Sequence, residues 1–463
     1  MPLQSSKWVT HRFGGGWATD LGTTVYTSPD QAGHISVPFL RDARNVTYEF
    51  DGGCRKIAGA NLLNTSAVAG GATVTGIYDY WRQGVAGSAT QRRVLHAGTV
   101  CMSDAADGVF ANIGTGLTSG AIPHYSTFDD FLIIGSSASG DVPRSWDQST
   151  FQILAGSPPR FSFSIPHRNH QWAAGDYANP SRLYYSATLD PEDWTAASSG
   201  SIDIDPNDGD SITGIISHKN ELWVFKGPYK GSIHRITGSV EADFARTTFM
   251  TGLAVGWIHS LFRFGDDIGF ITAYGSVHSL KATASFGDYN QAYFSYSIGT
   301  YVREQLNHSR NQYFTATNDA ANGRVWIGVT TSGQSTNTRQ LIMDYRFLAG
   351  NEPFPRWSYF DTQALASTTY ARDTNARMRI FAGGYNGFVY RFDQEGRTVN
   401  GAAINYRVET PALTYGDEWL LKSVGDIALS LNALNDNAVT EGWKGDGVTS
   451  NSTTVTQGSV GGK

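Results

Sequence analysis

Cysteine is almost absent from this sequence, since only Cys54 and Cys101 occur among its 463 residues. Two cysteines could pair, but they exclude a disulfide-rich scaffold. A chain of this length also buries enough apolar surface to fold without a disulfide. We therefore expect both residues to be free, structural thiols.

Charged residues are also scarce. They make up 16% of the chain, the formal net charge is −6, and the longest basic cluster is the doublet Arg92 and Arg93. A surface that binds nucleic-acid phosphates tightly needs clustered lysine and arginine. The composition therefore argues against such a surface.

Long apolar runs and the common catalytic signatures are missing as well. No run approaches the length needed to span a bilayer, and the first thirty residues lack the basic and apolar regions of a secretion signal. No glycine-rich phosphate loop, nucleophile elbow or thiol–imidazole pair stands out. We expect a soluble, unsecreted protein that is not an enzyme, with no catalytic, cofactor-binding or metal-binding residues.

Glycine and aromatic residues are plentiful. The chain has 52 glycines and 13% aromatic residues, which is typical of short strands joined by tight turns, so helices should be few. A hairpin unit recurs, with an apolar first strand, a turn and a second strand. The first strands of its copies lie at residues 91–97, 130–135, 169–174, 220–226, 267–271, 323–329 and 378–383. The second strands include residues 108–110, 143–147, 183–186, 232–236, 275–280, 341–345 and 387–392.

The spacing of these hairpins predicts an all-β fold, a β-propeller of six or seven blades. The central residues of the first strands lie 37 to 56 residues apart, which suits four-stranded blades. Runs such as 222–225 do not alternate polar and apolar residues, so both faces of the strand should be buried. A set of generic hairpins in separate β-domains is the alternative.

The repeats divide the chain into a propeller, over residues 76–395, and two flanks. Residues 1–75 and 396–441 should form a β-module packed on the propeller, with strand candidates at 404–408 and 426–431. Residues 442–463 are poor in apolar side chains, so we expect a flexible tail that only a neighbouring protein orders.

An acidic cluster at Asp203, Asp205, Asn207, Asp208 and Asp210 begins like a calcium-binding loop. The match then fails, because Asp208 stands where that loop needs glycine and residue 214 is a glycine instead of glutamate. We expect an inter-blade turn in which the side chains bond the backbone.

Two further groups could suggest a site. His167 and His170 are three residues apart but lack further ligands nearby, which favours a surface loop. Asp190, Glu192 and Asp193 stand beside Trp194, which could suggest a glycosidase. A turn opened by Asp-Pro, with the tryptophan covering a blade, explains the same residues.

One stretch, from residue 183 to residue 280, carries a resemblance to a known family. It reads YYS at 184–186, DPEDW at 190–194, GDSITGI at 209–215, ELWVFK at 221–226, IHRITG at 233–238 and FITAYGSV at 270–277. This resembles the propeller proteins of short-tailed bacteriophages, the tail nozzle or hub, similar to the packaged-DNA stabilisation proteins. The GGGW at 14–17, LRDARNV at 40–46 and DGG at 51–53 look like the lead-in of that family.

The resemblance implies a structural virion protein in the phage tail, made in the host bacterial cytoplasm. Six copies would form a ring below the portal and the adaptor or head-to-tail connector, extend the DNA channel, help retain the genome and conduct it during ejection. A tail needle or plug and tailspikes or fibres would be further partners, and DNA would pass without sequence-specific binding. The tail at 442–463 and the segments 238–265 and 282–320 are the candidate subunit contacts.

Two other functions remain open. A glycan-binding or glycan-cleaving propeller could use some of the 12 tryptophans and 22 tyrosines to stack sugars, although most fall inside the repeated strands, where core packing explains them. A cellular interaction platform of the WD type would need Gly-His and Trp-Asp pairs in each repeat. Only Trp146 and Asp147 form such a Trp-Asp pair. The repeats also lack the turn Ser-x-Asp-x-Gly-x-x-Trp that marks sialidase-like propellers, since residues 145–149 resemble it only superficially.

Overall fold

The structure is a computed structural model that describes residues 10–13, 15–20, 24–25, 34–37, 39–50, 53–84, 89–106, 108–281, 293–350, 354–394, 396–413, 438–443 and 451–456. It contains two compact units, Met1–Gly416 and Asp417–Lys463. No helix among the described residues is long and apolar enough to cross a membrane.

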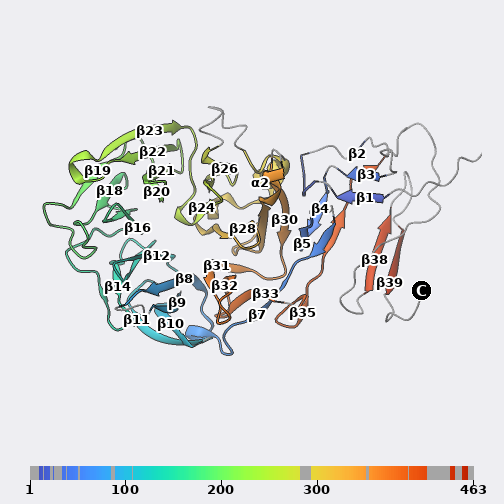
Figure 1. Ribbon diagram of the computed structural model, residues 1–463, viewed down its shortest axis with the longest axis horizontal. Helices are drawn as coiled ribbons and strands as arrows, with labels where there is room; N and C mark the ends of the chain where they lie inside the picture. The colour runs from blue at the N-terminus through green and yellow to red at the C-terminus, as the bar shows by residue number, and fades with distance from the viewer. Residues whose placement is uncertain are drawn as a thin grey trace, which may run out of the picture. The chain divides into compact units, whose positions relative to one another are not determined.

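Seven sheets radiate around a central axis in the first unit (Figure 1), which confirms the β-propeller and gives the higher of the two expected blade numbers. Blade 1 contains β8 (Val74–Arg82), β9 (Thr90–Ala97), β10 (Val100–Ala106) and β11 (Val109–Thr115). Blade 2 contains β12 (Pro123–Phe128), β13 (Phe131–Ser136), β14 (Arg144–Trp146) and β15 (Phe151–Ile153). Blade 3 contains β16 (Phe163–His167), β17 (His170–Ala174), β18 (Arg182–Tyr185) and β19 (Gly200–Asp203).

The remaining blades follow in chain order. Blade 4 contains β20 (Ser211–His218), β21 (Glu221–Gly227), β22 (Ser232–Thr237) and β23 (Ala245–Thr251), and blade 5 contains β24 (Leu261–Phe264), β25 (Asp267–Ile271) and β26 (Val277–Ser279). Blade 6 contains β27 (Thr315–Asp319), β28 (Arg324–Val329), β29 (Arg339–Asp344) and β30 (Arg356–Phe360). Blade 7 contains β31 (Leu365–Arg372), β32 (Met378–Gly384) and β33 (Val389–Gln394).

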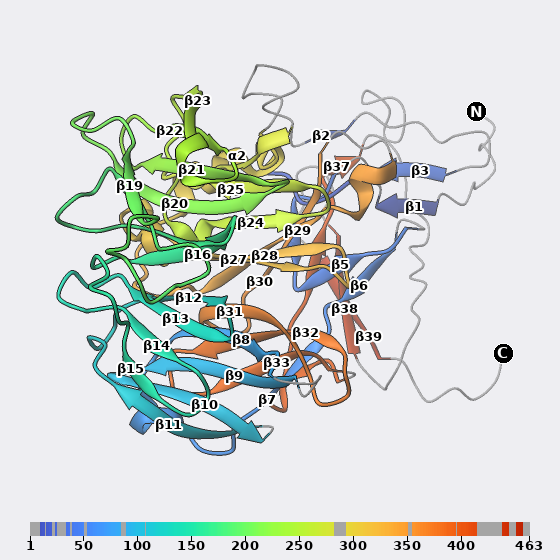
Figure 2. The same cartoon turned by 60° about the vertical axis from the view of Figure 1, so that its left-hand side comes forward.

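The first strand of each blade faces the axis. Neighbouring inner strands lie beside one another, as Figure 2 shows for β8, β12, β16 and β20. The strands expected as the first of each hairpin are the second strands of the blades. They are buried on both faces, as expected, and in β21 every residue after Glu221 is buried.

Tight turns between the first two strands fix the register of several blades. In blade 3, Arg168 and Asn169 have φ angles of 50° and 64°, so His167 pairs directly with His170. Lys219 and Asn220 make the same turn in blade 4, with φ angles of 48° and 63°. Two consecutive residues with positive φ form the turn type that matches the twist of a hairpin.

One hairpin was assigned wrongly from the sequence. The strand that follows β9 is β10, after a turn at Gly98 with φ of 63°, and residues 108–110 begin the fourth strand, β11. Strand β10 pairs on both sides, but most of its residues are small, and Ser103 and Asp104 interrupt its apolar run. Segment 238–265 likewise contains β23 and β24, so much of it belongs to blades 4 and 5.

Strands from both flanks join blades 6 and 7. From the amino-terminal flank, β7 (Gly59–Leu62) pairs with β33 as the fourth strand of blade 7, and β4 (Asp42–Arg44) lies beside β30. From the other flank, β36 (Arg407–Glu409) pairs with β4, and β34 (Thr398–Val399) pairs with β7 and with β35 (Ala402–Ala403). Parts of residues 1–75 and 396–441 therefore extend the sheets of the propeller.

The appended β-module from the two chain ends is present. Its other pairs are β1 (Thr10–Phe13) with β3 (His34–Val37), β2 (Thr24–Val25) with β37 (Ala412–Leu413), and β5 (Val46–Tyr48) with β6 (Cys54–Lys56). The pairing of β2 with β37 joins residues almost 400 positions apart in the sequence. The strand predicted at 426–431 lies outside the described residues.

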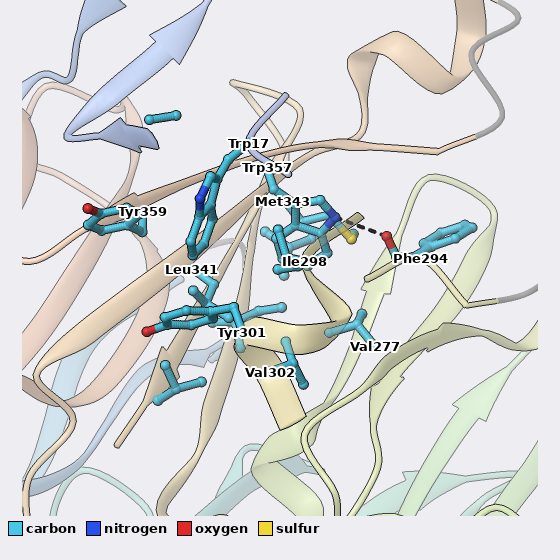
Figure 3. Packing of buried hydrophobic residues seen from close by; sticks show 14 of the residues in the cluster. Trp17, Val277, Phe294, Ile298, Tyr301, Val302, Leu341, Met343, Trp357 and Tyr359 are labelled. Carbon is cyan, nitrogen blue, oxygen red and sulfur yellow. Dashed lines mark hydrogen bonds between the residues drawn. The ribbon is translucent and has the colours of Figure 1, made fainter. Parts of the chain in front are cut away.

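Trp17 of the module packs into a large cluster with blades 5 and 6 (Figure 3). Its ring centroid lies 4.7 Å from that of Tyr301 and 5.0 Å from that of Tyr359. In the same cluster, Trp357 Nε1 donates a 2.9 Å hydrogen bond to the Phe294 carbonyl. This burial fixes the module to the propeller.

Helical segments are short, as expected. They include α2 (Gly299–Gln305) and the 3-10 turns η1 (Val68–Gly71), η2 (Glu241–Asp243), η3 (Ile258–Ser260), η4 (Tyr296–Ile298), η5 (His308–Tyr313) and η6 (Arg346–Gly350).

The second unit contains an antiparallel pair, β38 (Ala438–Trp443) and β39 (Asn451–Thr456). Strand β39 lies within residues 442–463, which the composition predicted to be ordered only by a neighbouring protein. The chain's own strand β38 supplies its backbone partners instead.

Candidate functional site

A small hollow with a volume of about 50 Å³ lies among inner strands of the propeller, and it has room for one or a few water molecules. Its lining includes Thr75, Pro123, Tyr125, His259, Thr315 and Ser367.

Hydrogen bonds between blades hold the inner strands together. The fully buried Gln171 donates from Nε2 to Ser126 Oγ and Ser164 Oγ, each at 2.7 Å, and so joins blades 2 and 3. Ser367 Oγ donates to the Val74 carbonyl at 2.7 Å, which joins blade 7 to blade 1 and closes the ring.

Two histidine rings lie side by side near the axis, with the centroids of His124 and His259 5.7 Å apart. Burial lowers the pKa of His259 to about 4. Burial, with the neighbouring His259, lowers the pKa of His124 to about 3. Both rings are therefore neutral at pH 7 and add no charge near the axis of the propeller.

The acidic cluster surrounds a buried lysine. Lys226, fully buried in β21, donates from Nζ to both carboxylate oxygens of Asp208 at 2.9 Å and to the Ile204 and Asp205 carbonyls at 2.7 and 2.9 Å. Of the carboxylates that suggested a calcium loop, Asp208 therefore pairs with this ammonium group, while Asp203 and Asp205 pair with Arg182 and Arg246. Among the described residues, no group of three or more His, Cys, Asp or Glu side chains could hold a metal ion.

The end of the cluster shapes a turn, as expected. The buried Asp210 accepts hydrogen bonds from the backbone N–H groups of Tyr229, Lys230 and Gly231 at 2.7 to 2.9 Å. Asp208 accepts from the Asp210 N–H at 2.9 Å. These carboxylates connect blades 3 and 4 by bonding the backbone.

The two histidines predicted in a surface loop are buried instead. His167 and His170 are 8% and 1% exposed, because the two-residue turn between them places both rings against the sheets. His167 Nδ1 lies 2.8 Å from Ser217 Oγ in blade 4, and burial lowers the His167 pKa to about 4. The prediction was wrong because local spacing does not show which face of a hairpin is covered.

Two of the three carboxylates near Trp194 bond the backbone of their own turn, while Glu192 accepts a 3.1 Å hydrogen bond from Ser145 Oγ in β14. Asp190 accepts from the Glu192 N–H at 2.9 Å, and Asp193 accepts from the N–H groups of residues 195 and 196 at 2.9 and 3.0 Å. Trp194 packs 5.6 Å from Phe161 against the core of blades 2 and 3. This agrees with the predicted turn and blade-covering tryptophan.

The Trp146–Asp147 pair also builds a turn. Trp146 is buried, while Asp147 accepts hydrogen bonds from the N–H groups of Ser149 and Thr150 at 2.9 and 2.7 Å. The same carboxylate oxygen serves both donors, so the pair stabilises the connection between β14 and β15.

Most of the tryptophans whose burial is described belong to the core. Of the tryptophans whose burial is described, only Trp81 is exposed, at 38%, and the buried ones are Trp17, Trp146, Trp172, Trp223, Trp326 and Trp357. Trp81 borders an open hollow of about 580 Å³, together with Arg82, Gln83 and Asp129. Asp130 at its edge accepts hydrogen bonds from the Gln83 and Gly84 N–H groups.

Sequence reasoning missed two features. Lys226 looked like the end of an apolar strand, and only the fold shows what surrounds it. Three tyrosines, Tyr177, Tyr229 and Tyr274, are 59%, 72% and 65% exposed in turns between strands. Their neighbours were a usable signal, since Pro228 and Gly231 surround one and Gly275 follows another.

Comparison with known proteins identifies no family. No family model and no curated protein matches the chain. Among solved structures, YCF48 from Cyanidioschyzon merolae is similar at 10% identity and a TM-score of 0.44, over 73% of this chain and 100% of that one. Raptor from Chaetomium thermophilum is similar at 12% identity and a TM-score of 0.44, over 76% of this chain and 30% of that one.

Proposed function

We propose that this chain is a structural, non-catalytic subunit of a phage tail, the nozzle or hub of a short-tailed phage. The observation that carries the proposal is the β-module in which strands from both chain ends pair with each other and extend blades 6 and 7. A propeller joined to such a module is what the family resemblance leads us to expect.

DNA would pass through a conduit between copies arranged in a ring, as the family resemblance implies. Six copies at −6 each would carry a formal charge of −36, which disfavours tight binding of phosphates as the genome slides past. The adaptor, a needle or plug, and tailspikes or fibres remain the partners that we propose.

Mass photometry of the purified chain, alone and mixed with proteins from neighbouring reading frames, tests this function. We expect a large species that appears in negative stain as a six-fold ring with a central hole. A monomer that assembles with none of these proteins would refute the proposal.

The hollow beside Trp81 favours a second candidate, a glycan-binding propeller. An exposed indole beside Arg82, Gln83 and Asp129 offers a stacking surface with hydrogen-bonding groups. Binding to immobilised bacterial polysaccharide that is lost in Trp81→Ala would support it. If neither the wild-type protein nor the Trp81→Ala variant binds the polysaccharide, glycan binding is excluded.

A further inference from the structure

Three Asn-Gly pairs occur in the sequence, and all three lie in turns between strands. Residues 322–323 are between β27 and β28, residues 386–387 between β32 and β33, and residues 400–401 between β34 and β35. Asparagine before glycine loses its side-chain amide easily, because glycine has no Cβ to hinder the approach of its backbone nitrogen to the asparagine Cγ. The three pairs therefore share one chemistry but have different surroundings.

The fold holds the side chain of Asn322. Its Nδ2 donates hydrogen bonds to Asp319 Oδ2 at 2.9 Å and to Asp393 Oδ2 at 3.0 Å, so the amide bridges blades 6 and 7. Gly323 is buried, and its N–H donates to the Ala320 carbonyl at 3.4 Å. Attack of this nitrogen on the Asn322 Cγ would first have to break these hydrogen bonds.

The fold also restrains Asn386 and Gly387. The Asn386 Nδ2 donates to Tyr390 Oη at 3.3 Å, and the Asn386 Oδ1 accepts from the Phe388 N–H at 3.4 Å. Gly387 is buried, and its carbonyl accepts a 2.9 Å hydrogen bond from the Val68 N–H. Both the side-chain amide and the glycine backbone of this pair are therefore held in place.

The third pair, Asn400 and Gly401, lies at an open end of the structure. It joins β34 to β35, and β35 is the edge strand of the six-stranded sheet that includes blade 7 (Figure 1). The two turn residues and both residues of β35 are exposed. Their φ angles of 47° and 81° are those of a two-residue hairpin turn. A Cβ added to Gly401 would meet no atom within 4 Å, so solvent reaches this pair freely.

The reacting atoms of this pair are not restrained by the described part of the chain. Among the described residues, no hydrogen bond holds the Asn400 side-chain amide or the Gly401 N–H. Ring closure requires rotation about the Asn400 Cα–C bond, so the turn must open. Opening breaks only the two residue pairs that join β34 to β35, and exposed ends of this kind open at little cost in free energy. The 2.8 Å hydrogen bond from the Asn400 N–H to the Ala60 carbonyl can remain.

We propose that Asn400 is a site of spontaneous deamidation, whereas the fold protects Asn322 and Asn386. The Gly401 nitrogen attacks the Asn400 Cγ, and the bond from Cγ to Nδ2 breaks. Ammonia leaves with the proton of the Gly401 nitrogen, and a cyclic succinimide forms. Solvent water then adds across one of the two imide C–N bonds and gives aspartate or isoaspartate. Water is the only co-reactant, and the inference does not rest on the proposed function.

Either product changes the edge of the sheet. Both carry a negative charge in place of the neutral amide, and isoaspartate also adds a methylene group to the main chain, which a two-residue turn does not accommodate. Val399 is 4% exposed and pairs with Ala60 of β7 before the modified residue. Strand β34 should therefore stay in the sheet while β35 detaches from it.

Peptide mapping by mass spectrometry tests the site on the wild-type chain, incubated in mildly alkaline buffer. Conversion of an amide to an acid raises the peptide mass, and chromatography separates isoaspartate from aspartate. We expect residue 400 to deamidate at least about tenfold faster than residues 322 and 386, because the other two pairs must first break hydrogen bonds that the fold provides. Asn400→Asp carries the same added charge and is the reference for ion-exchange separation of the modified chain.

The same measurement in concentrated urea is the control. Unfolding removes the hydrogen bonds, so the three asparagines should then deamidate at similar rates. Equal rates in the folded chain, or a faster loss at residue 322 or 386, would overturn the inference. An advantage of residue 400 that persists unchanged in urea would also overturn it, because the neighbouring sequence would then set the rate instead of the fold. The result does not depend on assembly, so a chain that never forms a ring would refute the proposed function and leave this inference standing.

Discussion

Replacing Lys226 with methionine tests how blades 3 and 4 are joined. The substitution keeps the length and the apolar stem of the side chain but removes the ammonium group. The Lys226 Nζ lies within 3.2 Å of oxygens from four residues. Ile204, Asp205 and Asp208 are in the connection between β19 and β20, and Ser181 stands just before β18. The variant would leave these acceptors without their donor and the Asp208 carboxylate without its cation.

We expect Lys226→Met to lower the free energy of unfolding by about 3 kcal/mol. An ammonium group donates three hydrogen bonds, and each buried acceptor left unsatisfied costs roughly 1 to 3 kcal/mol. Breaking a buried ion pair from one side costs about 3 to 5 kcal/mol. The Asp208 side chain is 26% exposed, so water can solvate part of its charge, which favours the lower end of this range.

Urea unfolding followed by tryptophan fluorescence and by circular dichroism measures this change, provided that both signals give the same transition. Lys230→Met is the matched control, because this exposed lysine lies four residues away and should change stability by less than about 0.5 kcal/mol. Adding Asp208→Asn to Lys226→Met should recover part of the loss, since it removes the uncompensated charge. A Lys226→Met midpoint equal to that of the wild type would refute the reasoning.

Other predictions follow from buried groups and from the chain end. Burial lowers the pKa of His96, His167 and His259 to about 4 and that of His124 to about 3, so between pH 6.5 and 4 the unfolded chain binds protons that the folded chain does not. The melting temperature in calorimetry should therefore fall as the pH drops from 6.5, and a constant value would contradict this. Burial and the nearby Asp393 raise the pKa of Asp319 to about 6, so Asp319→Asn should stabilise the protein above pH 6 and have no effect below pH 4; an equal effect at both pH values would argue against that pKa. Trp223→Ala should leave a cavity and lower the free energy of unfolding by about 3 to 5 kcal/mol. Urea unfolding measures this change, and a loss below about 1 kcal/mol would contradict the prediction. Deleting residues 442–463 should weaken assembly while the monomer stays folded by circular dichroism, and an unfolded product would refute the tail assignment.

Much of the propeller could be predicted from its second strands. Segments such as 222–225 and 325–329 are apolar on both faces, and only stacked sheets bury both faces of a strand. The β10 strand was missed because its residues are mostly small or polar, and pairing on both sides compensates for weak propensity. The blade number depended on which hairpins belong to the ring, and pairing distant in sequence decides that.

The candidate sites also combine features that the sequence predicted with features that only the fold shows. The missing glycine at position 208 and the missing glutamate at position 214 argued against a calcium loop, because the residue types along the chain decide which ligands such a loop can offer. The pairing of Lys226 with Asp208 could not be predicted from the sequence. Lys226 follows the acidic cluster in the chain and reaches Asp208 only when blade 4 stacks on blade 3. The surface loop predicted for His167 and His170 was wrong for the same reason, because the burial of these residues depends on neighbouring blades.

By itself, the sequence determined the all-β class, the repeated hairpins, the scarcity of helices and the turn chemistry of the aspartates, because each depends on neighbouring residues and short-range periodicity. Only the tertiary structure decided that seven blades close the ring, that β7 completes blade 7, and that Trp17 seals the module onto blades 5 and 6. Those features arise from pairing and packing between residues far apart in the chain, which local sequence patterns do not specify.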